Sequence, residues 1–262
     1  MARVSTYVGI DVACAKGKRL PLCFVTYQGD QLVPLRIPVE LRNRVPRGLG
    51  NAEIKSEHPF RRTADELADA LLDIAGECGW SIQCVAIDAP AACPEDGSRT
   101  CERALSKAGI SCFYTPNRAQ WLGVIDECRR YLNAGKPLSG MPNANRVWML
   151  YGFEIFRALR ASGLTVIETY PQAIVRCLLG DDCPSKLTKE GLAMQLGAVA
   201  RATCWDPRLL EDALVRACAG QRHDRLDAFM AASVAALEPG RRTVYGKVDS
   251  DDDAIWVPKK IP

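Results

Sequence analysis

The chain has 262 residues, of which 48% are hydrophobic and 25% are charged, and its formal net charge is +3. This is an ordinary globular composition of one or two domains, and so small a charge does not by itself predict a nucleic-acid partner. The 12 cysteines form no Cys-x-x-Cys pair, which argues against zinc and disulfide frameworks. Without a signal peptide or an apolar run of roughly 20 residues, we expect a reduced, cytoplasmic protein with no membrane contact.

The first part of the chain predicts an antiparallel meander followed by a helix. Three apolar runs are expected to form strands, and Gly29-Asp30 predicts a hairpin between the last two. These strands cover residues 5–12, 20–28 and 31–37. The stretch 38–62 is rich in arginine and proline, and it is either a solvated loop or a phosphate-contacting segment. A helix is expected from Thr63, because Thr63-Ala64-Asp65-Glu66 has the pattern of a capping box.

The rest of the chain alternates short strands with helices. Residues 81–88 are apolar on both faces, as parallel strands under helices are, and 164–167 form another short strand. Helical stretches at about 115–160 and 185–220 are predicted insertions in a single α/β domain covering 1–262. Two short β-prone runs flank an acidic turn at 249–253.

Acidic side chains end these strands and open the closing helix. Asp11 and Asp88 each end an apolar run, and Glu168 follows the run 164–167. Asp224 and Asp227 are three residues apart, so they share one helix face. A buried carboxylate pair costs several kcal/mol unless a cation compensates it. We therefore expect these acids to meet at one sheet edge and to bind two Mg²⁺ or Mn²⁺ ions, which would activate water for phosphodiester hydrolysis.

Each acid also has a structural interpretation. Asp11 would bond its own turn, Asp88 would cap a loop, and Glu168 would pair with a cation at a strand end. Asp224 would be the N-cap of the closing helix, which Asp prefers, and His223 a polar cap beside it. Asp227 is the hardest to explain in this way, because its neighbours are apolar.

Three further side chains are candidate substrate contacts. Lys16 lies in the turn after the first strand, and we expect it to contact phosphate. Arg118 is a second candidate for the same role, and His223 is placed to orient a water or a phosphate. A solvated surface position is the alternative for each lysine or arginine.

Four segments together resemble a known family. They are Val8-Gly9-Ile10-Asp11 with Lys16 behind it, Ala86-Ile87-Asp88-Ala89-Pro90, Ile167-Glu168-Thr169-Tyr170-Pro171 and His223-Asp224-Arg225-Leu226-Asp227-Ala228. They are similar to domain-of-unknown-function family 429, predicted nucleases of the ribonuclease-H-like superfamily, over roughly Ser5 to Pro258. The first and last segments also resemble Holliday-junction resolvases.

The resemblance implies a fold and a set of metal ligands. The fold is a five-stranded mixed sheet of order 3-2-1-4-5, flanked by helices, with the first three strands antiparallel. Asp11, Asp88 and Asp227 would be metal ligands, with Asp224 beside them and Glu168 at the end of the fifth strand. The resemblance implies no particular substrate.

The leading functional prediction is a metal-dependent nuclease acting on DNA or RNA. One alternative is a non-catalytic module that binds nucleic acid or protein, although a binder of phosphate gains nothing from clustered acids. Another is a phosphotransferase of the actin-like class, whose first strand also reads Gly-Ile-Asp. The sequence shows no second glycine-rich phosphate loop for it.

Overall fold

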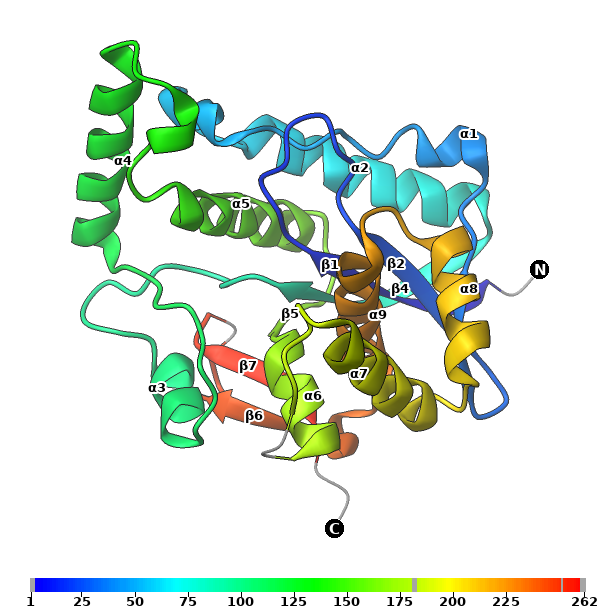
Figure 1. Cartoon of the computed structure of the whole chain (residues 1–262). Helices are drawn as coiled ribbons and strands as arrows, with labels where there is room; N and C mark the ends of the chain where they lie inside the picture. The colour runs from blue at the N-terminus through cyan, green and yellow to red at the C-terminus, as the bar shows by residue number, and fades with distance from the viewer. Residues whose placement is uncertain (1–2, 181–182, 251, 260–262) are drawn as a thin grey trace.

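The computed structural model describes residues 3–180, 183–250 and 252–259, and its centre is a mixed sheet of seven strands (Figure 1). The strand order is β3-β2-β1-β4-β5-β7-β6. The strands are β1 Val4–Asp11, β2 Leu22–Gln28, β3 Gln31–Leu35, β4 Trp80–Asp88, β5 Val166–Thr169, β6 Arg242–Gly246 and β7 Ala254–Pro258. Strand β2 is antiparallel to β1 and β3, which confirms the predicted meander.

The sheet is larger than expected, so the predicted five-stranded order 3-2-1-4-5 is not confirmed. The two β-prone runs near the carboxyl end join it as β6 and β7, beyond β5. Strand β7 is parallel to β5, with Glu168 opposite Ile255 and Thr169 opposite Trp256, and β6 is antiparallel to β7. What is established is an α/β architecture with a mixed seven-stranded sheet flanked by helices.

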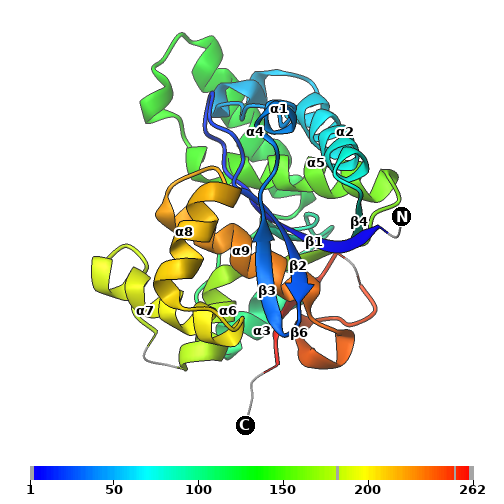
Figure 2. The same ribbon diagram turned by 90° about the vertical axis from the view of Figure 1, so that its right-hand side faces the viewer.

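Helices cover both faces of the sheet (Figures 1 and 2). They are α1 Val39–Arg42, α2 Arg61–Glu77, α3 Thr100–Lys107, α4 Arg118–Asn133, α5 Val147–Ala161, α6 Pro171–Leu179, α7 Lys189–Ala202, α8 Pro207–Ala217 and α9 Arg222–Ala236. Helices α2 and α5 pack together over one face, and α9 lies on the other face against β1, β2 and β4. The predicted insertions at 115–160 and 185–220 form α4 with α5, and α7 with α8. No helix in the described ranges has both the length and the apolar character that a membrane crossing requires.

Strand β1 shows why α9 lies where it does. Val8 and Ile10 belong to the core under α2 and α5, while Gly9 faces α9. A Cβ at Gly9 would lie 2.0 Å from the Ala228 carbonyl oxygen and 2.2 Å from the Ala232 nitrogen. Only glycine permits this approach, which brings the residues around Ala228 to the carboxyl end of β1.

Helix α2 begins two residues before its predicted start near Thr63, and the predicted capping box is wrong. The helix begins at Arg61, and its N-cap is Phe60, whose φ of 68° is left-handed and whose side chain makes no capping hydrogen bond. Thr63 is inside the helix and only 5% exposed. Burial of Phe60 in the core therefore determines the entry to α2, and the Thr63-Ala64-Asp65-Glu66 pattern does not form a capping box.

Candidate functional site

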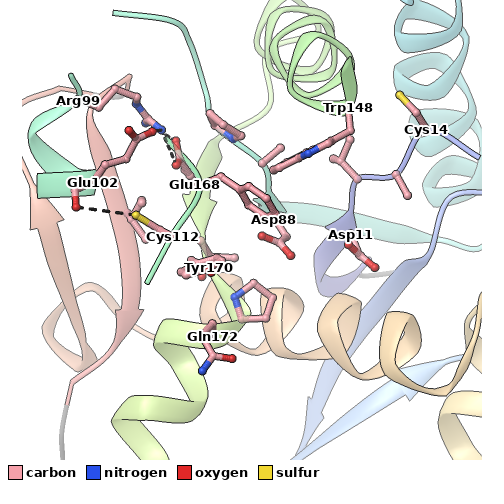
Figure 3. Close-up of a pocket in the computed structure, with 18 of the residues that line it drawn as sticks. Asp11, Cys14, Asp88, Arg99, Glu102, Cys112, Trp148, Glu168, Tyr170 and Gln172 are labelled. Atoms are coloured by element: carbon pink, nitrogen blue, oxygen red, sulfur yellow. Dashed lines mark hydrogen bonds and ion pairs between the residues drawn. The ribbon is translucent and has the colours of Figure 1, made fainter. Parts of the chain in front are cut away.

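The carboxyl ends of β1, β4 and β5 open into a cavity of about 450 Å³ (Figure 3). Asp11 and Asp88 line it together with Trp148, and Glu168 lines it beside Arg99. The cavity lies where the chain leaves parallel strands, which is the usual position of ligand sites in α/β sheets.

Asp11 and Asp88 are neighbours on adjacent parallel strands. They are register partners across β1 and β4, so their side chains point to the same face of the sheet. Two residues earlier on each strand, Gly9 and Ala86 both pack toward α9, which identifies that face. Because adjacent strands are about 4.8 Å apart, the two carboxylates form a close pair, as the sequence predicts.

Asp227 joins this pair from α9. Its side chain is buried, with 2% of the residue exposed, and its Oδ2 accepts a hydrogen bond from the Lys186 ammonium. Within the described part of the chain its other oxygen, Oδ1, has no hydrogen-bond partner. We call Asp11, Asp88 and Asp227 the carboxylate cluster.

Burial and mutual repulsion raise the pKa values in the carboxylate cluster. Burial, and then the negative charges of Asp227 and Asp224, raise the pKa of Asp11 to about 8. Burial, followed by the charges of Asp11 and Asp227, raises the pKa of Asp88 well above its ordinary value. Burial also raises the pKa of Asp227, and Lys186 opposes the rise at all three carboxyls. The cluster is therefore short of positive charge.

Asp224 serves the helix end, although it lies close enough to raise the pKa of Asp11. Its carboxylate accepts a hydrogen bond of 2.9 Å from the Gln221 backbone N–H and lies 3.1 Å from His223 Nε2. The N-cap of α9 is Gln221, three residues before Asp224, so the expected N-cap assignment of Asp224 itself is corrected to the reciprocal position of a capping box.

Glu168 does not enter the carboxylate cluster. It is the register partner of Ile87 and not of Asp88, so its side chain points to the opposite face. There it accepts hydrogen bonds of 2.8 and 2.5 Å from the two terminal nitrogens of Arg99 and one of 2.8 Å from the Ala91 N–H. This bidentate pairing matches the structural interpretation of Glu168 rather than the expected role in a metal cluster.

Arg99 organises this second group of acids, and the sequence analysis did not find it. It is 2% exposed and lies 3.6 Å from Glu102, whose carboxylate accepts a hydrogen bond of 3.1 Å from the Thr115 N–H. We call Arg99, Glu102 and Glu168 the arginine cluster. Arg99 and Glu168 are 69 positions apart, so no local spacing signals their pairing.

The hairpin between β6 and β7 supports the arginine cluster. The Asp252 carbonyl oxygen accepts a hydrogen bond of 2.8 Å from Arg99. Asp253 accepts hydrogen bonds of 2.9 Å from the backbone N–H groups of Thr100 and Cys101, at the start of α3. Burial raises the pKa of Asp253, but these backbone donors outweigh it and leave the pKa lowered.

The predicted substrate contacts lie outside the cavity lining. Lys16 is exposed and packs against Gly50, and Arg118 pairs with Glu95 at 3.3 Å with 70% of its side chain exposed. His223 contacts Asp224 at the start of α9. The cation that lines the cavity beside the carboxylate cluster is Lys186, which the sequence analysis missed.

Aromatic side chains also line the cavity and were not expected there. The rings of Phe113 and Trp148 lie edge to face, with centroids 5.4 Å apart and an interplanar angle of 71°. Tyr170 donates a hydrogen bond of 2.9 Å to the Ser111 carbonyl oxygen. Burial, and then the charge of Asp88, raise the pKa of Tyr170.

The carboxylate cluster has the ligand atoms that a divalent metal ion prefers, but its side chains are not arranged as a complete coordination shell. No group of three or more His, Cys, Asp or Glu side chains in the described ranges has an arrangement that would hold a metal ion. Asp11, Asp88 and Asp227 offer the hard oxygen donors that Mg²⁺ and Mn²⁺ prefer, and Oδ1 of Asp227 is unpaired. These three residues are the ones that would hold an ion.

Comparison with known proteins identifies a family. The model of a family described as "Protein of unknown function (DUF429)" matches residues 9–250 of the chain. No curated protein and no solved structure matches it. The matched range contains every member of the carboxylate and arginine clusters.

Proposed function

The chain belongs to the DUF429 family of proteins of unknown function, and we propose that it is a divalent-metal-dependent nuclease acting on phosphodiesters at the carboxylate cluster. The observation that carries the proposal is the shortage of positive charge around Asp11, Asp88 and Asp227. A structural acid is normally compensated by direct bonds to a cation, as Glu168 is by both terminal nitrogens of Arg99. Acids that repel one another in a cavity are typical of a site that binds a cation.

The charges of the cluster indicate how many ions it takes. Three ionised carboxylates carry a charge of −3, and the Lys186 ammonium bonded to Asp227 contributes +1. One divalent ion would therefore bring the sum to zero. We propose one ion in place of the two expected from the sequence, with Lys186 supplying part of the charge that a second ion would bring.

Each side chain has a role in this proposal. A bound Mg²⁺ or Mn²⁺ supplies Lewis acidity and a nucleophilic water. Asp11 and Asp88 hold the ion from two adjacent strands, and Oδ1 of Asp227 is a further oxygen donor. Lys186 lines the cavity, keeps Asp227 in position and presents a positive charge to the phosphate.

The position of these acids also supports assignment to the ribonuclease-H-like superfamily, which we propose for the part of the sheet formed by β3-β2-β1-β4-β5. Asp11 and Asp88 end the two central strands of that part, and Asp227 lies on a helix packed against them. Strands β7 and β6 would then be additions at one edge.

The decisive experiment is cleavage of DNA and RNA by the purified chain with Mg²⁺, with Mn²⁺ or with a chelator. We expect metal-dependent cleavage that Asp11→Asn and Asp88→Asn each reduce by more than the roughly 10–100-fold typical of partners outside the metal shell. Asp212→Asn is the matched control, because Asp212 is exposed on α8 away from the cavity. Circular dichroism would establish that all variants fold.

Other outcomes would favour the alternatives. Nucleic-acid binding without cleavage, unchanged in the two variants and by chelator, would contradict the nuclease and indicate a non-catalytic module. Thermal protection by ATP would indicate a phosphotransferase. None of the described residues lining the cavity is a glycine, which does not favour that class, because glycine-rich loops are what bring backbone N–H groups to nucleotide phosphates.

A further inference from the structure

Phe113, Trp148 and Tyr170 bring aromatic rings to the cavity that holds the acids. We call these three residues the aromatic wall. Figure 3 shows Trp148 and Tyr170 around the same hollow as Asp11 and Asp88. Phe113 is 54% exposed although it is large and apolar. Exposed aromatic surface inside a concave site is typical of ligand binding rather than of core packing.

The fold fixes Trp148 relative to Asp88. A Cβ at Gly152 would lie 2.6 Å from the Ala89 Cβ, so α5 approaches the residue after Asp88 as closely as glycine allows. Trp148 is one helical turn before Gly152 and lies on the same face of α5. This packing directs the indole toward the cavity, beside the acids.

The polar groups of the aromatic wall are already satisfied. The Trp148 indole N–H donates a hydrogen bond of 2.9 Å to the Asn145 carbonyl oxygen, and the Tyr170 hydroxyl donates to Ser111. What Trp148 and Phe113 can offer a ligand is therefore the surface of their rings. Stacking on such rings is how proteins hold unpaired nucleobases.

We propose that the aromatic wall binds an unpaired nucleobase next to the scissile phosphate, an inference that rests on the proposed function. The substrate would then be single-stranded nucleic acid. A cavity of about 450 Å³ falls in the range of roughly 300–1,000 Å³ that holds small ligands. It can admit a base that has left its stack but not a base pair inside a duplex, whose faces are already covered. DNA and RNA share this chemistry.

Binding experiments on the intact chain test the proposal without requiring cleavage. The probes are fluorescent oligonucleotides of about eight nucleotides, within the site sizes of single-strand binders: oligothymidylate, oligouridylate and a duplex hairpin. Anisotropy gives Kd with Ca²⁺ in place of Mg²⁺. We expect both single strands to bind more tightly than the duplex. Any difference between the thymidylate and uridylate arms tells whether the substrate is DNA or RNA.

Variants of the aromatic wall separate stacking from general binding. Trp148→Leu and Phe113→Leu should each weaken single-strand binding between about 5-fold and 150-fold, the equivalent of 1–3 kcal/mol. Trp148→Phe should restore most of the affinity. Tyr114→Leu is the matched control, because Tyr114 is 43% exposed beside Phe113 but does not line the cavity.

The possible results distinguish this inference from the nuclease proposal. Single-strand binding that depends on the aromatic wall, without metal-dependent cleavage, would support the inference and contradict the nuclease. Cleavage of duplex and single strand alike, unaffected by Trp148→Leu and Phe113→Leu, would overturn the inference and leave the nuclease standing. Failure of both single strands to bind would also overturn the inference.

Discussion

Two groups of acids at the cavity differ in how their charges are compensated, and all their members except Asp227 line it. In the arginine cluster, Glu168 receives both ends of the Arg99 guanidinium and a backbone N–H, and Glu102 is bonded to Thr115. In the carboxylate cluster, the Lys186 ammonium bonds to Asp227. Burial raises the pKa values of the acids in both groups, including Glu102 and Glu168. After burial, the largest influence on Glu168 is Arg99, which lowers its pKa, whereas the largest influence on Asp11 and Asp88 is a neighbouring aspartate, which raises the pKa. Burial is common to both groups, so burial of an acid does not identify a functional site.

What distinguishes the two groups is an unmet demand for positive charge. In the arginine cluster both terminal nitrogens of Arg99 are bonded within the chain, although its Nε has no hydrogen-bond partner among the described residues, and the cluster has the character of a structural ion pair. The carboxylate cluster keeps acids close together that repel one another, at a cost to the folded state. Residues retained at such a cost are candidates for binding or catalysis. Four predictions test this contrast, ordered from the largest expected loss in the free energy of unfolding to the expected gains.

Removing Arg99 should have the largest effect. Arg99→Met leaves Glu102 and Glu168 buried without their cation, and we expect a loss of about 3–5 kcal/mol in the free energy of unfolding, measured in urea. The double variant Arg99→Met/Glu168→Leu should recover the part of this loss that comes from Glu168, because an apolar pair of similar size needs no cation, while Glu102 stays buried without its cation. A loss for Asp227→Asn as large as that for Arg99→Met would contradict the contrast between the clusters.

Separating α9 from β1 should disturb the carboxylate cluster alone. Gly9→Ala places a methyl group 2.0 Å from the Ala228 carbonyl oxygen, so α9 must move, and overpacking of this kind costs about 1–3 kcal/mol. We expect cleavage to fall because Asp227 moves with α9. Gly76→Ala is the matched control, since its Cβ would have open space. Unchanged cleavage by a folded Gly9→Ala variant would show that Asp227 is not needed near Asp11.

Adding a divalent cation should stabilise the chain. At ten times its Kd, an ion that binds only the folded state contributes about 1.4 kcal/mol. This corresponds to about 3–6 °C in Tm for a chain of this size. The shift should disappear in Asp88→Asn and persist in Glu168→Gln, as measured by thermal unfolding with Mg²⁺ and Mn²⁺. An equal shift in both variants would place the ion elsewhere.

Removing the carboxyl group of Asp11 should stabilise the chain and change how its stability depends on pH. Its carboxyl has a pKa of about 8 in the folded chain against an ordinary value of 3.8. At pH values between 3.8 and about 8, the folded state therefore keeps a proton on Asp11 that the unfolded state has released. The free energy of unfolding consequently falls as the pH rises through this range. Asp11→Asn should reduce this slope and stabilise the chain near neutral pH, while the raised pKa values of Asp88 and Asp227 preserve part of the slope.

Urea unfolding at about pH 5 and about pH 8, without divalent cations, measures this slope. Asp212→Asn, on the surface of α8, should leave the slope as it is in the unmodified chain. A variant slope equal to that of the unmodified chain would show that Asp11 does not titrate in this range.

The sequence predicts the parts of the fold and site that depend on local pattern. The meander, the buried strand ending at Asp88 and the helix carrying Asp227 all follow from apolar runs and their bounds. The convergence of Asp11 and Asp88 follows from their positions at the ends of parallel strands. The close approach at Gly9 explains why small residues stand on both β1 and α9.

The errors come from features that no local pattern encodes. Strand β5 has four residues, apolar before Glu168, and so short a strand shows no alternation that would tell which face Glu168 takes. The Arg99–Glu168 pair and the addition of β7 to β5 both join distant parts of the chain. At Thr63 the polar pattern predicted a helix start, but tertiary packing of Phe60 determined it instead.

The hairpin of β6 and β7 has a consequence for how the cavity is completed during synthesis. Its Asp252 carbonyl holds Arg99, its Asp253 carboxylate holds the start of α3, and Ile255 lines the cavity. Translation proceeds from the amino end, and domains can begin to fold before synthesis is complete. A ribosome-bound chain that ends before residue 242 would contain Asp11, Asp88 and Asp227. It would lack the β6–β7 hairpin that supports Arg99 and α3. Limited proteolysis of such stalled chains should cut near α3. The full-length chain should be protected at the same site.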